Sequence, residues 1–158
     1  MSNDEIINVI KKYVKGVCEN DSTGHDWWHI QRVYNNAMQI NKKENANEFL
    51  ITVIVLMHDL YDHKFYNGDV KEALEDTLQK LDVYNYISKE DAENIIHSCI
   101  NLGFSSNITD VKELSIEGKI AQDADRLDGI GAKEIAIERH EYLEGFLNEF
   151  YDEWNGVK

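Results

Sequence analysis

Residues 46–60 read ANEFLITVIVLMHDL, and this stretch decides the fold. Its apolar residues fall on nearly every side of a helix, which is typical of a helix buried at the centre of a bundle. They are Leu50, Ile51, Val53, Ile54, Val55, Leu56 and Met57. We therefore expect a central helix from about Ala46 to Leu60, and this helix carries His58 and Asp59 side by side near its end.

Apolar residues at helical spacing recur along the rest of the chain, and no window alternates cleanly enough to predict a strand. Ser2 and Glu5 frame the start of the first helix as a capping box, in which each side chain satisfies a free backbone amide. The sequence contains no proline and no low-complexity tract, so no linker between domains is predicted. We expect a single domain over residues 1–158, an all-α bundle of about seven helices. Besides the central helix, the others are expected around residues 6–14 and over about 26–43, 70–81, 88–102, 115–128 and 133–154.

The chain of 158 residues is strongly acidic: 16 Lys and Arg against 30 Asp and Glu give a net charge of −14 with histidine neutral. This charge argues against nucleic-acid binding through a basic patch and against adhesion to anionic membranes. The sequence contains no apolar run long enough to predict a transmembrane helix. The stretch MSNDEIINVI does not resemble an export signal, so a cytoplasmic location is expected. An extended helical surface is compatible with a homodimer.

His58 and Asp59 follow directly from the apolar run. Burying an imidazole and a carboxylate without partners costs several kcal/mol, so we expect a compensating group beside them. A metal ion is one such group, because imidazole nitrogen together with carboxylate oxygen suits Mn, Fe, Mg or Zn better than metals that prefer thiolates. Neighbouring helical residues point about 100° apart, so both can bind one ion only if it lies between this helix and others.

Two further helices offer the remaining ligands, His29 and Asp125. Two histidines and two aspartates would leave about two octahedral positions open for water and a phosphate oxygen. Alternatively, His29 is a hydrogen-bonded histidine of the core or surface, and His58-Asp59 is a polar pair at a helix end. The four residues together, at helix positions that can converge, favour the metal site. Asp123 is the main rival of Asp125 as the fourth ligand, although the helix turns it about 160° away.

The order of these residues resembles the H…HD…D signature of the HD-domain superfamily of metal-dependent phosphohydrolases. Each element also has the sequence context of that family: H-x-x-R-V for the first histidine, an apolar helix that runs into the HD pair, and A-D-R-L around the last aspartate. In this chain these contexts are HIQRV at 29–33, LMHD at 56–59 and ADRL at 124–127.

Two longer segments, TGHDWWH at 23–29 and QDADRLDGIGA at 122–132, resemble a small bacterial subgroup of HD hydrolases associated with nucleotide pyrophosphohydrolysis. The similarity covers about residues 1–132. Beyond it the chain departs from the subgroup, because Ala132 runs almost directly into the last expected helix. The subgroup has a longer stretch there, with a loop and an additional helical segment, so this chain is shortened in that region.

The resemblance implies that His29, His58, Asp59 and Asp125 are the metal ligands. Mn²⁺ or Mg²⁺ is the expected ion, with Fe²⁺, Ni²⁺ and Zn²⁺ as alternatives. Asp62 matches an acidic position that family members use to position or deprotonate the attacking water. It lies three residues after Asp59, nearly one helical turn, and so falls on the same face.

The cations expected on the substrate phosphates are Lys64 and Arg32, with Arg126 as a further candidate. Lys64 would also serve catalysis, because it neutralises charge next to the reacting phosphate. Arg32 has a rival role of equal weight, an ion pair that holds Asp123 or Asp125.

Other side chains have more open assignments. His25 and Asp128 could each face the pocket. His97 would be a further ligand only in a dinuclear site, as in HD-fold di-iron oxygenases, and is expected to pack in the core instead. Trp27 and Trp28 are interpreted as packing residues, although one of them could stack on a base.

Together these features predict a divalent-metal-dependent phosphohydrolase that acts on nucleotides and releases pyrophosphate from (deoxy)nucleoside triphosphates. One alternative is a nucleotide phosphomonoesterase, and another is a metal- or nucleotide-binding protein with little turnover. Because a chain of charge −14 repels such an anion, the metal ion and the local Lys and Arg must outweigh the overall field.

Overall fold

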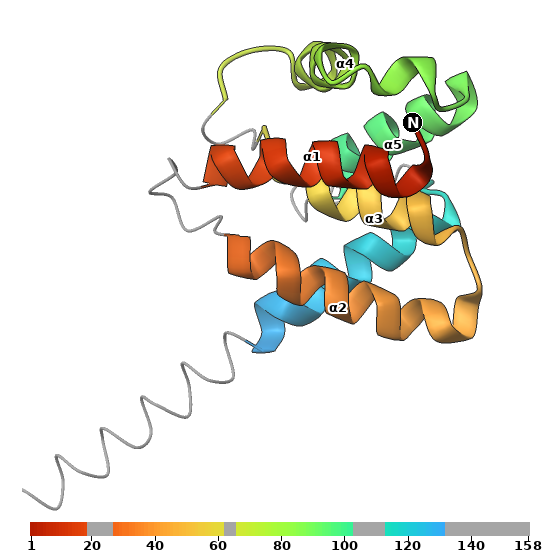
Figure 1. Ribbon diagram of the computed structural model, residues 1–158. Coiled ribbons are helices and arrows are strands. Elements are labelled where there is room, and N and C mark those ends of the chain that lie inside the picture. The colour runs from red at the N-terminus through yellow and green to blue at the C-terminus, as the bar shows by residue number, and fades with distance from the viewer. Residues whose placement is uncertain (19–26, 62–65, 103–112, 132–158) are drawn as a thin grey trace, which may run out of the picture.

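The computed structural model describes residues 1–18, 27–61, 66–102 and 113–131, and within these ranges the regular structure is helical, without a strand (Figure 1). The expected all-α fold is confirmed, and each helix expected before residue 132 is present. The helix expected over 133–154 lies outside the described residues. The observed helices are α1 (Asn3–Cys18), α2 (Trp27–Glu44), α3 (Glu48–Met57), α4 (Val70–Lys80), the short 3₁₀ helix η1 (Val83–Asn85), α5 (Lys89–Asn101) and a helix over 116–131.

The apolar helix α3 lies at the centre of the bundle, as the sequence predicts. All its residues from Leu50 to Met57 are buried. It packs against α1, α2 and α5, while α4 packs on α5 at the outside (Figure 1). Because side chains on every face of α3 are shielded from water, this helix holds its C-terminal residues in a fixed place within the bundle.

The start of α3 is two residues later than the sequence predicts, and side chains of the preceding turn explain the difference. Asn45 adopts a left-handed conformation with φ 52°, which ends α2. The Asn41 side chain accepts a hydrogen bond from the backbone N–H of Ala46 at 2.8 Å and donates one to its carbonyl at 3.3 Å. Asn47 then caps α3 by accepting from the second and third amides of the helix.

The amphipathic helix α1 begins with the expected capping box. The backbone N–H of Ser2 donates to Glu5 Oε2 at 2.6 Å, and the N–H of Glu5 donates to Ser2 Oγ at 3.3 Å. The residues at four-residue spacing along its inner face, Ile6, Ile10 and Val14, are fully or almost fully buried. The apolar period that predicts α1 thus coincides with the face that packs on α3.

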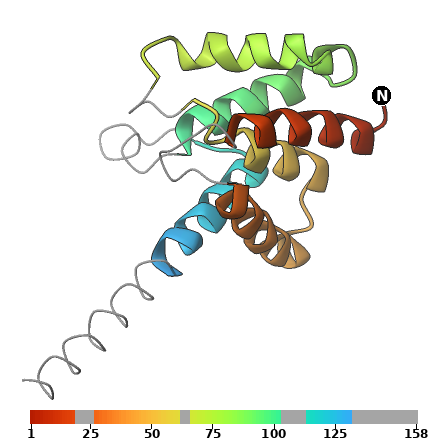
Figure 2. The same ribbon diagram turned by 60° about the vertical axis from the view of Figure 1, so that its left-hand side comes forward.

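The helix over 116–131 lies beside α2 and ends near the start of that helix (Figures 1 and 2). Ala121 and Ala124 are completely buried, and Asn36 of α2 donates to the carbonyl of Ala124 at 3.4 Å. Gln122 donates to the carbonyl of Leu102, just after α5, at 3.2 Å. These contacts fix the helix against two others and so fix the aspartates that it carries.

Among the described residues, no helix combines the length and the apolar character that crossing a bilayer requires.

Candidate metal centre

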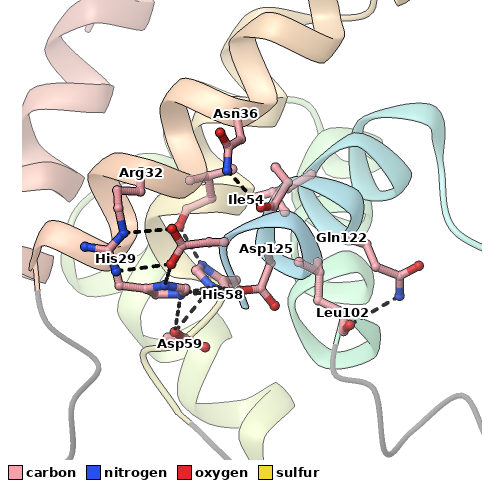
Figure 3. Close-up of polar contacts among 12 residues, drawn as sticks. His29, Arg32, Asn36, Ile54, His58, Asp59, Leu102, Gln122 and Asp125 are labelled. Atoms are coloured by element: carbon pink, nitrogen blue, oxygen red, sulfur yellow. Dashed lines mark hydrogen bonds and ion pairs between the residues drawn. The ribbon is translucent and has the colours of Figure 1, made fainter. Parts of the chain in front are cut away.

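Four predicted ligands from three elements meet at one point of the bundle (Figure 3). His29 comes from the first turn of α2, and Asp125 comes from the helix over 116–131. His58 is the C-cap of α3, and Asp59 follows it in the turn. The rigid, buried α3 therefore delivers two of the four side chains, and the other two approach from helices that pack beside it.

The donor atoms of these side chains lie close together. The Nε2 atoms of His29 and His58 are 3.4 Å apart. Asp59 Oδ2 lies 3.3 Å from the Nε2 of His29 and 3.2 Å from that of His58. Asp125 Oδ1 lies 3.3 Å and 3.7 Å from the same two atoms. One ligand atom each from His29, His58 and Asp125 falls within 4.8 Å of the other two, which is close enough to hold a metal ion.

The outer nitrogen of each histidine has a fixed partner. His58 Nδ1 lies 2.8 Å from the carbonyl oxygen of Val55, and because a carbonyl only accepts, Nδ1 carries the proton. His29 Nδ1 lies 2.8 Å from Asp128 Oδ2 and donates to it. Both rings therefore direct Nε2 inward. Metal-binding histidines are oriented in this way by a carbonyl or a carboxylate on the other ring nitrogen.

The donor set fits a divalent cation. Two imidazole nitrogens and two carboxylate groups are ligands that Mn, Fe, Zn and related ions accept, whereas this cluster offers no thiolate for a soft metal. His58 is only 3% exposed, whereas Asp125 is 33% exposed, so one side of the cluster is closed and the other reaches solvent.

The pKa values of the cluster reflect its crowding. Hydrogen bonds to Asp125 and then Asp59 raise the pKa of His29 to about 10, against the effect of burial. Burial lowers the pKa of His58, but the charges of Asp59 and Asp125 outweigh it and the net shift is upward. Burial raises the pKa of Asp125, yet its contacts with the two histidines hold that pKa well below its usual range. Because the pKa values of both imidazoles are raised, a divalent cation would compete with protons for them.

Arg32 pairs with Asp128, so the predicted partners Asp123 and Asp125 were wrong, although an ion pair was the right kind of contact. Its Nε donates to Asp128 Oδ1 at 2.7 Å and its Nη2 donates to Oδ2 at 3.1 Å. The sequence could not identify this partner, because the choice among three aspartates depends on how two helices cross. This contact occupies Nε and Nη2 of the guanidinium, and the role of Arg32 on substrate phosphates stays a prediction.

Asp123 and Arg126 lie on the outer face of the helix over 116–131. Asp123 is 64% exposed, and its Oδ1 lies 3.9 Å from Arg126 Nη1. Asp125, two residues away, is the aspartate that reaches His29 and His58. The structure thus brings Asp125 and not its rival Asp123 to the cluster, and the role of Arg126 on substrate phosphates stays a prediction.

Two expectations of packing were wrong. His97 is exposed on α5, where its Nε2 lies 3.1 Å from the carbonyl of Glu113, and it is not part of the cluster. It falls between the buried residues Ile96 and Ser98 in sequence but on the outer side of the helix. Trp28 is 69% exposed, whereas Trp27 packs partly against the core.

Asp62 and Lys64, the predicted catalytic residues, and also His25 lie outside the described residues. Their roles stay predictions. Asp128 was expected only as a residue that could face the pocket, because it follows Asp125 by three residues and so lies on the same face of its helix. Its contacts with His29 and Arg32 were not predicted.

Comparison with known proteins gives a matching family and several similar proteins. The HD domain family matches residues 27–130. The chain is 40% identical over 128 residues to YpgQ of Bacillus subtilis, an uncharacterised protein, and the match covers 80% of this chain and 62% of YpgQ. The chain thus spans less than two thirds of the length of that relative.

Solved structures with the same fold include YpgQ in complex with ADP, which is 35% identical with a TM-score of 0.63 and covers 89% of this chain and 70% of YpgQ. An HD-superfamily hydrolase from Bacillus thuringiensis is 31% identical with a TM-score of 0.65, covering 89% of this chain and 68% of that one. A protein from Lactobacillus plantarum is 30% identical with a TM-score of 0.69, covering 81% of this chain and 58% of that one.

Proposed function

This chain belongs to the HD domain family, and on that premise we propose that it is a divalent-metal-dependent phosphohydrolase that acts on nucleotides. The observation that carries the proposal is the meeting of His29, His58, Asp59 and Asp125, with both imidazoles held so that Nε2 faces the carboxylates. An HD-superfamily hydrolase among the similar structures supports hydrolysis as the reaction.

The four ligands would hold one divalent cation. When bound, such a cation polarises a phosphoryl oxygen and lowers the pKa of water, so that hydroxide becomes available near neutral pH. The carboxylates of Asp59 and Asp125 would balance its charge, and the histidines would fix its position because their own rings are anchored.

The attacking water would be oriented by Asp62, which would also accept its proton. A carboxylate near a divalent cation stays ionised and is therefore ready to act as a base. Lys64 would neutralise charge on the phosphate as the bond to the leaving group breaks. Both assignments rest on the match of these positions to the family pattern.

A nucleotide is the proposed substrate, and pyrophosphate release from a (deoxy)nucleoside triphosphate is the specific reaction. The crystal structure of the relative YpgQ in complex with ADP supports a nucleotide ligand. Because the net charge of −14 repels a triphosphate, the cation and Lys64 would supply local positive charge, with Arg126 as a further candidate.

An activity screen tests this function. Metal-stripped protein is reloaded with Mn²⁺ and offered nucleoside mono-, di- and triphosphates, and phosphate and pyrophosphate are measured separately. We expect pyrophosphate from triphosphates, and no product from the Asp59→Ala variant. Phosphate from monophosphates alone would replace the specific reaction by phosphomonoester hydrolysis. Bound Mn²⁺ without turnover of any nucleotide would contradict enzymatic activity and favour a metal-binding protein.

Two variants separate the ligands from the base. Asp59→Ala should lose both Mn²⁺ binding and hydrolysis, whereas Asp62→Ala should keep Mn²⁺ and lose most of the rate. Asp123→Asn is the matched control, because it neutralises an exposed carboxylate on the helix that carries Asp125. Equal loss of Mn²⁺ in the first two variants would make Asp62 a ligand and contradict its role as base.

A further inference from the structure

One side chain outside the ligand set contacts the centre from a partly buried position. The Asp128 side chain is 10% exposed, and both of its oxygens are engaged. Oδ2 accepts from His29 Nδ1 at 2.8 Å, while Oδ1 and Oδ2 accept from Arg32 Nε and Nη2 at 2.7 and 3.1 Å. The carboxylate therefore joins a guanidinium on one side to a metal-facing imidazole on the other.

The spacing of these residues makes the contact specific. His29 and Arg32 are three residues apart on α2, so they present side chains to the same neighbour. Asp125 and Asp128 have the same spacing on the opposing helix. On α2 the candidate ligand His29 and Arg32 therefore face the opposing helix together, and on that helix Asp128, one turn beyond the candidate ligand Asp125, contacts both of them.

The two histidines are anchored differently. The Nδ1 of His58 donates to Val55 within the same stretch of chain, so its orientation is set locally. His29 depends instead on a residue 99 positions away. We infer that Asp128 is a positioning residue for the metal centre, which holds His29 with Nε2 toward the ion, and that Arg32 acts through Asp128 rather than on the substrate. The inference rests on the proposed function in one respect, the presence of a divalent cation at the cluster.

The chemistry of the contact supports this role. A carboxylate that accepts from Nδ1–H fixes the tautomer in which Nε2 is the ligand atom, and it makes that nitrogen a better donor. The two-pronged contact with Arg32 prevents the carboxylate from rotating away. Nε and Nη2 of Arg32 contact Asp128. Removing Arg32 should therefore weaken metal binding more than phosphate binding.

Metal binding by purified variants tests the inference without any assay of activity. The affinity for Mn²⁺ is measured by competition with a chelator, and the visible spectrum of the Co²⁺-loaded protein reports the ligand geometry. Asp128→Ala should weaken Mn²⁺ binding by about 10- to 100-fold and change the Co²⁺ spectrum. Asp128→Asn, which keeps an acceptor oxygen, should recover part of the affinity and keeps the test open if the alanine variant does not fold.

Asp123→Asn is the matched control, because it removes an exposed charge from the same helix without touching His29. It should bind Mn²⁺ as the unaltered protein does. Arg32→Ala should weaken Mn²⁺ binding in the same direction as Asp128→Ala, and adding it to Asp128→Ala should cause little further loss.

Either of two results would overturn the inference. If Asp128→Ala and Asp123→Asn bind Mn²⁺ equally well and give the same Co²⁺ spectrum, Asp128 does not position the ligand. If Arg32→Ala raises KM for a nucleotide and leaves the Mn²⁺ affinity unchanged, Arg32 acts on the substrate. If the Mn²⁺ affinities of the variants follow the expected order but the protein hydrolyses no nucleotide, the proposed function is refuted and the role of Asp128 stands.

Discussion

Gly118→Ala should destabilise the protein at the contact between α5 and the helix over 116–131. A Cβ at this position would lie 2.6 Å from Ser98 Oγ and 3.2 Å from the Cβ atoms of Ser98 and Leu114. Rotation of the Ser98 hydroxyl would relieve the first contact only. Because Ser98 is completely buried, its side chain cannot move toward solvent, and the helices must separate slightly.

The expected magnitude follows from two opposing effects. Alanine in place of a helical glycine gains about 0.5–1 kcal/mol of stability, whereas excess volume in a packed contact costs about 1–3 kcal/mol. We expect a net loss of about 1–2 kcal/mol in the free energy of unfolding, or a decrease in Tm of about 2–8 °C for a chain of this size. Gly129 lies on the same helix with open space around its Cβ position, so Gly129→Ala should be neutral or stabilising.

Urea unfolding of the metal-free protein, followed by circular dichroism, measures both variants under the same conditions. Ser98→Ala removes the Oγ of the closest contact, so combining it with Gly118→Ala should recover about 1 kcal/mol relative to additivity. A Gly118→Ala variant as stable as Gly129→Ala would refute the close packing of these helices. Asp125 lies two turns beyond Gly118, so weaker Mn²⁺ binding should accompany the loss of stability.

Three further outcomes are expected. Asn47→Ala should lower the free energy of unfolding by about 0.5–2 kcal/mol, because the Asn47 side chain caps α3 through Phe49 N and Leu50 N; an unchanged urea midpoint would contradict the cap. Burial raises the pKa of Cys99 to about 12, so above pH 9 the thiol stays protonated in the native state but loses its proton on unfolding. The free energy of unfolding should therefore fall by up to about 1.4 kcal/mol per pH unit. Cys99→Ala should reduce this dependence between pH 9 and 11, and an equal slope in both proteins would exclude the shift. Mn²⁺ at about 100 times its Kd should stabilise the protein by about 2.7 kcal/mol and raise Tm by about 5–10 °C, whereas Asp59→Ala should melt alike with Mn²⁺ and with a chelator.

The helices could be predicted from sequence because burial in this bundle follows the helical period. The capping box at Ser2 and Glu5 and the buried run of α3 are local patterns, and both were correct. The boundaries were less accurate, because they depend on single side chains such as Asn41 and Asn47 whose hydrogen bonds a pattern of apolar residues does not contain.

At the site, the sequence predicted which residue types meet but not what supports them. The partner of His58 Nδ1 lies three residues earlier and follows from helix geometry alone. The pairing of Arg32 with Asp128 depends on the crossing of two helices, so the sequence could not distinguish it from a pairing with Asp123. His97 and Trp28 were assigned to the core because sequence does not reveal which face of a helix its neighbours leave uncovered.

The wide separation in sequence between His29 and Asp128 affects the local unfolding of the helix over 116–131. These residues are 99 positions apart, so a cation held by His29, His58, Asp59 and Asp125 would close a large loop of chain and act as a crosslink. Without that crosslink, the helix over 116–131 is kept in place mainly by its small buried face and its hydrogen bonds to α2 and α5. Amide hydrogen exchange in residues 116–131 should therefore be faster than in α3 when the metal is removed, and should slow more than exchange in α3 when the metal is restored.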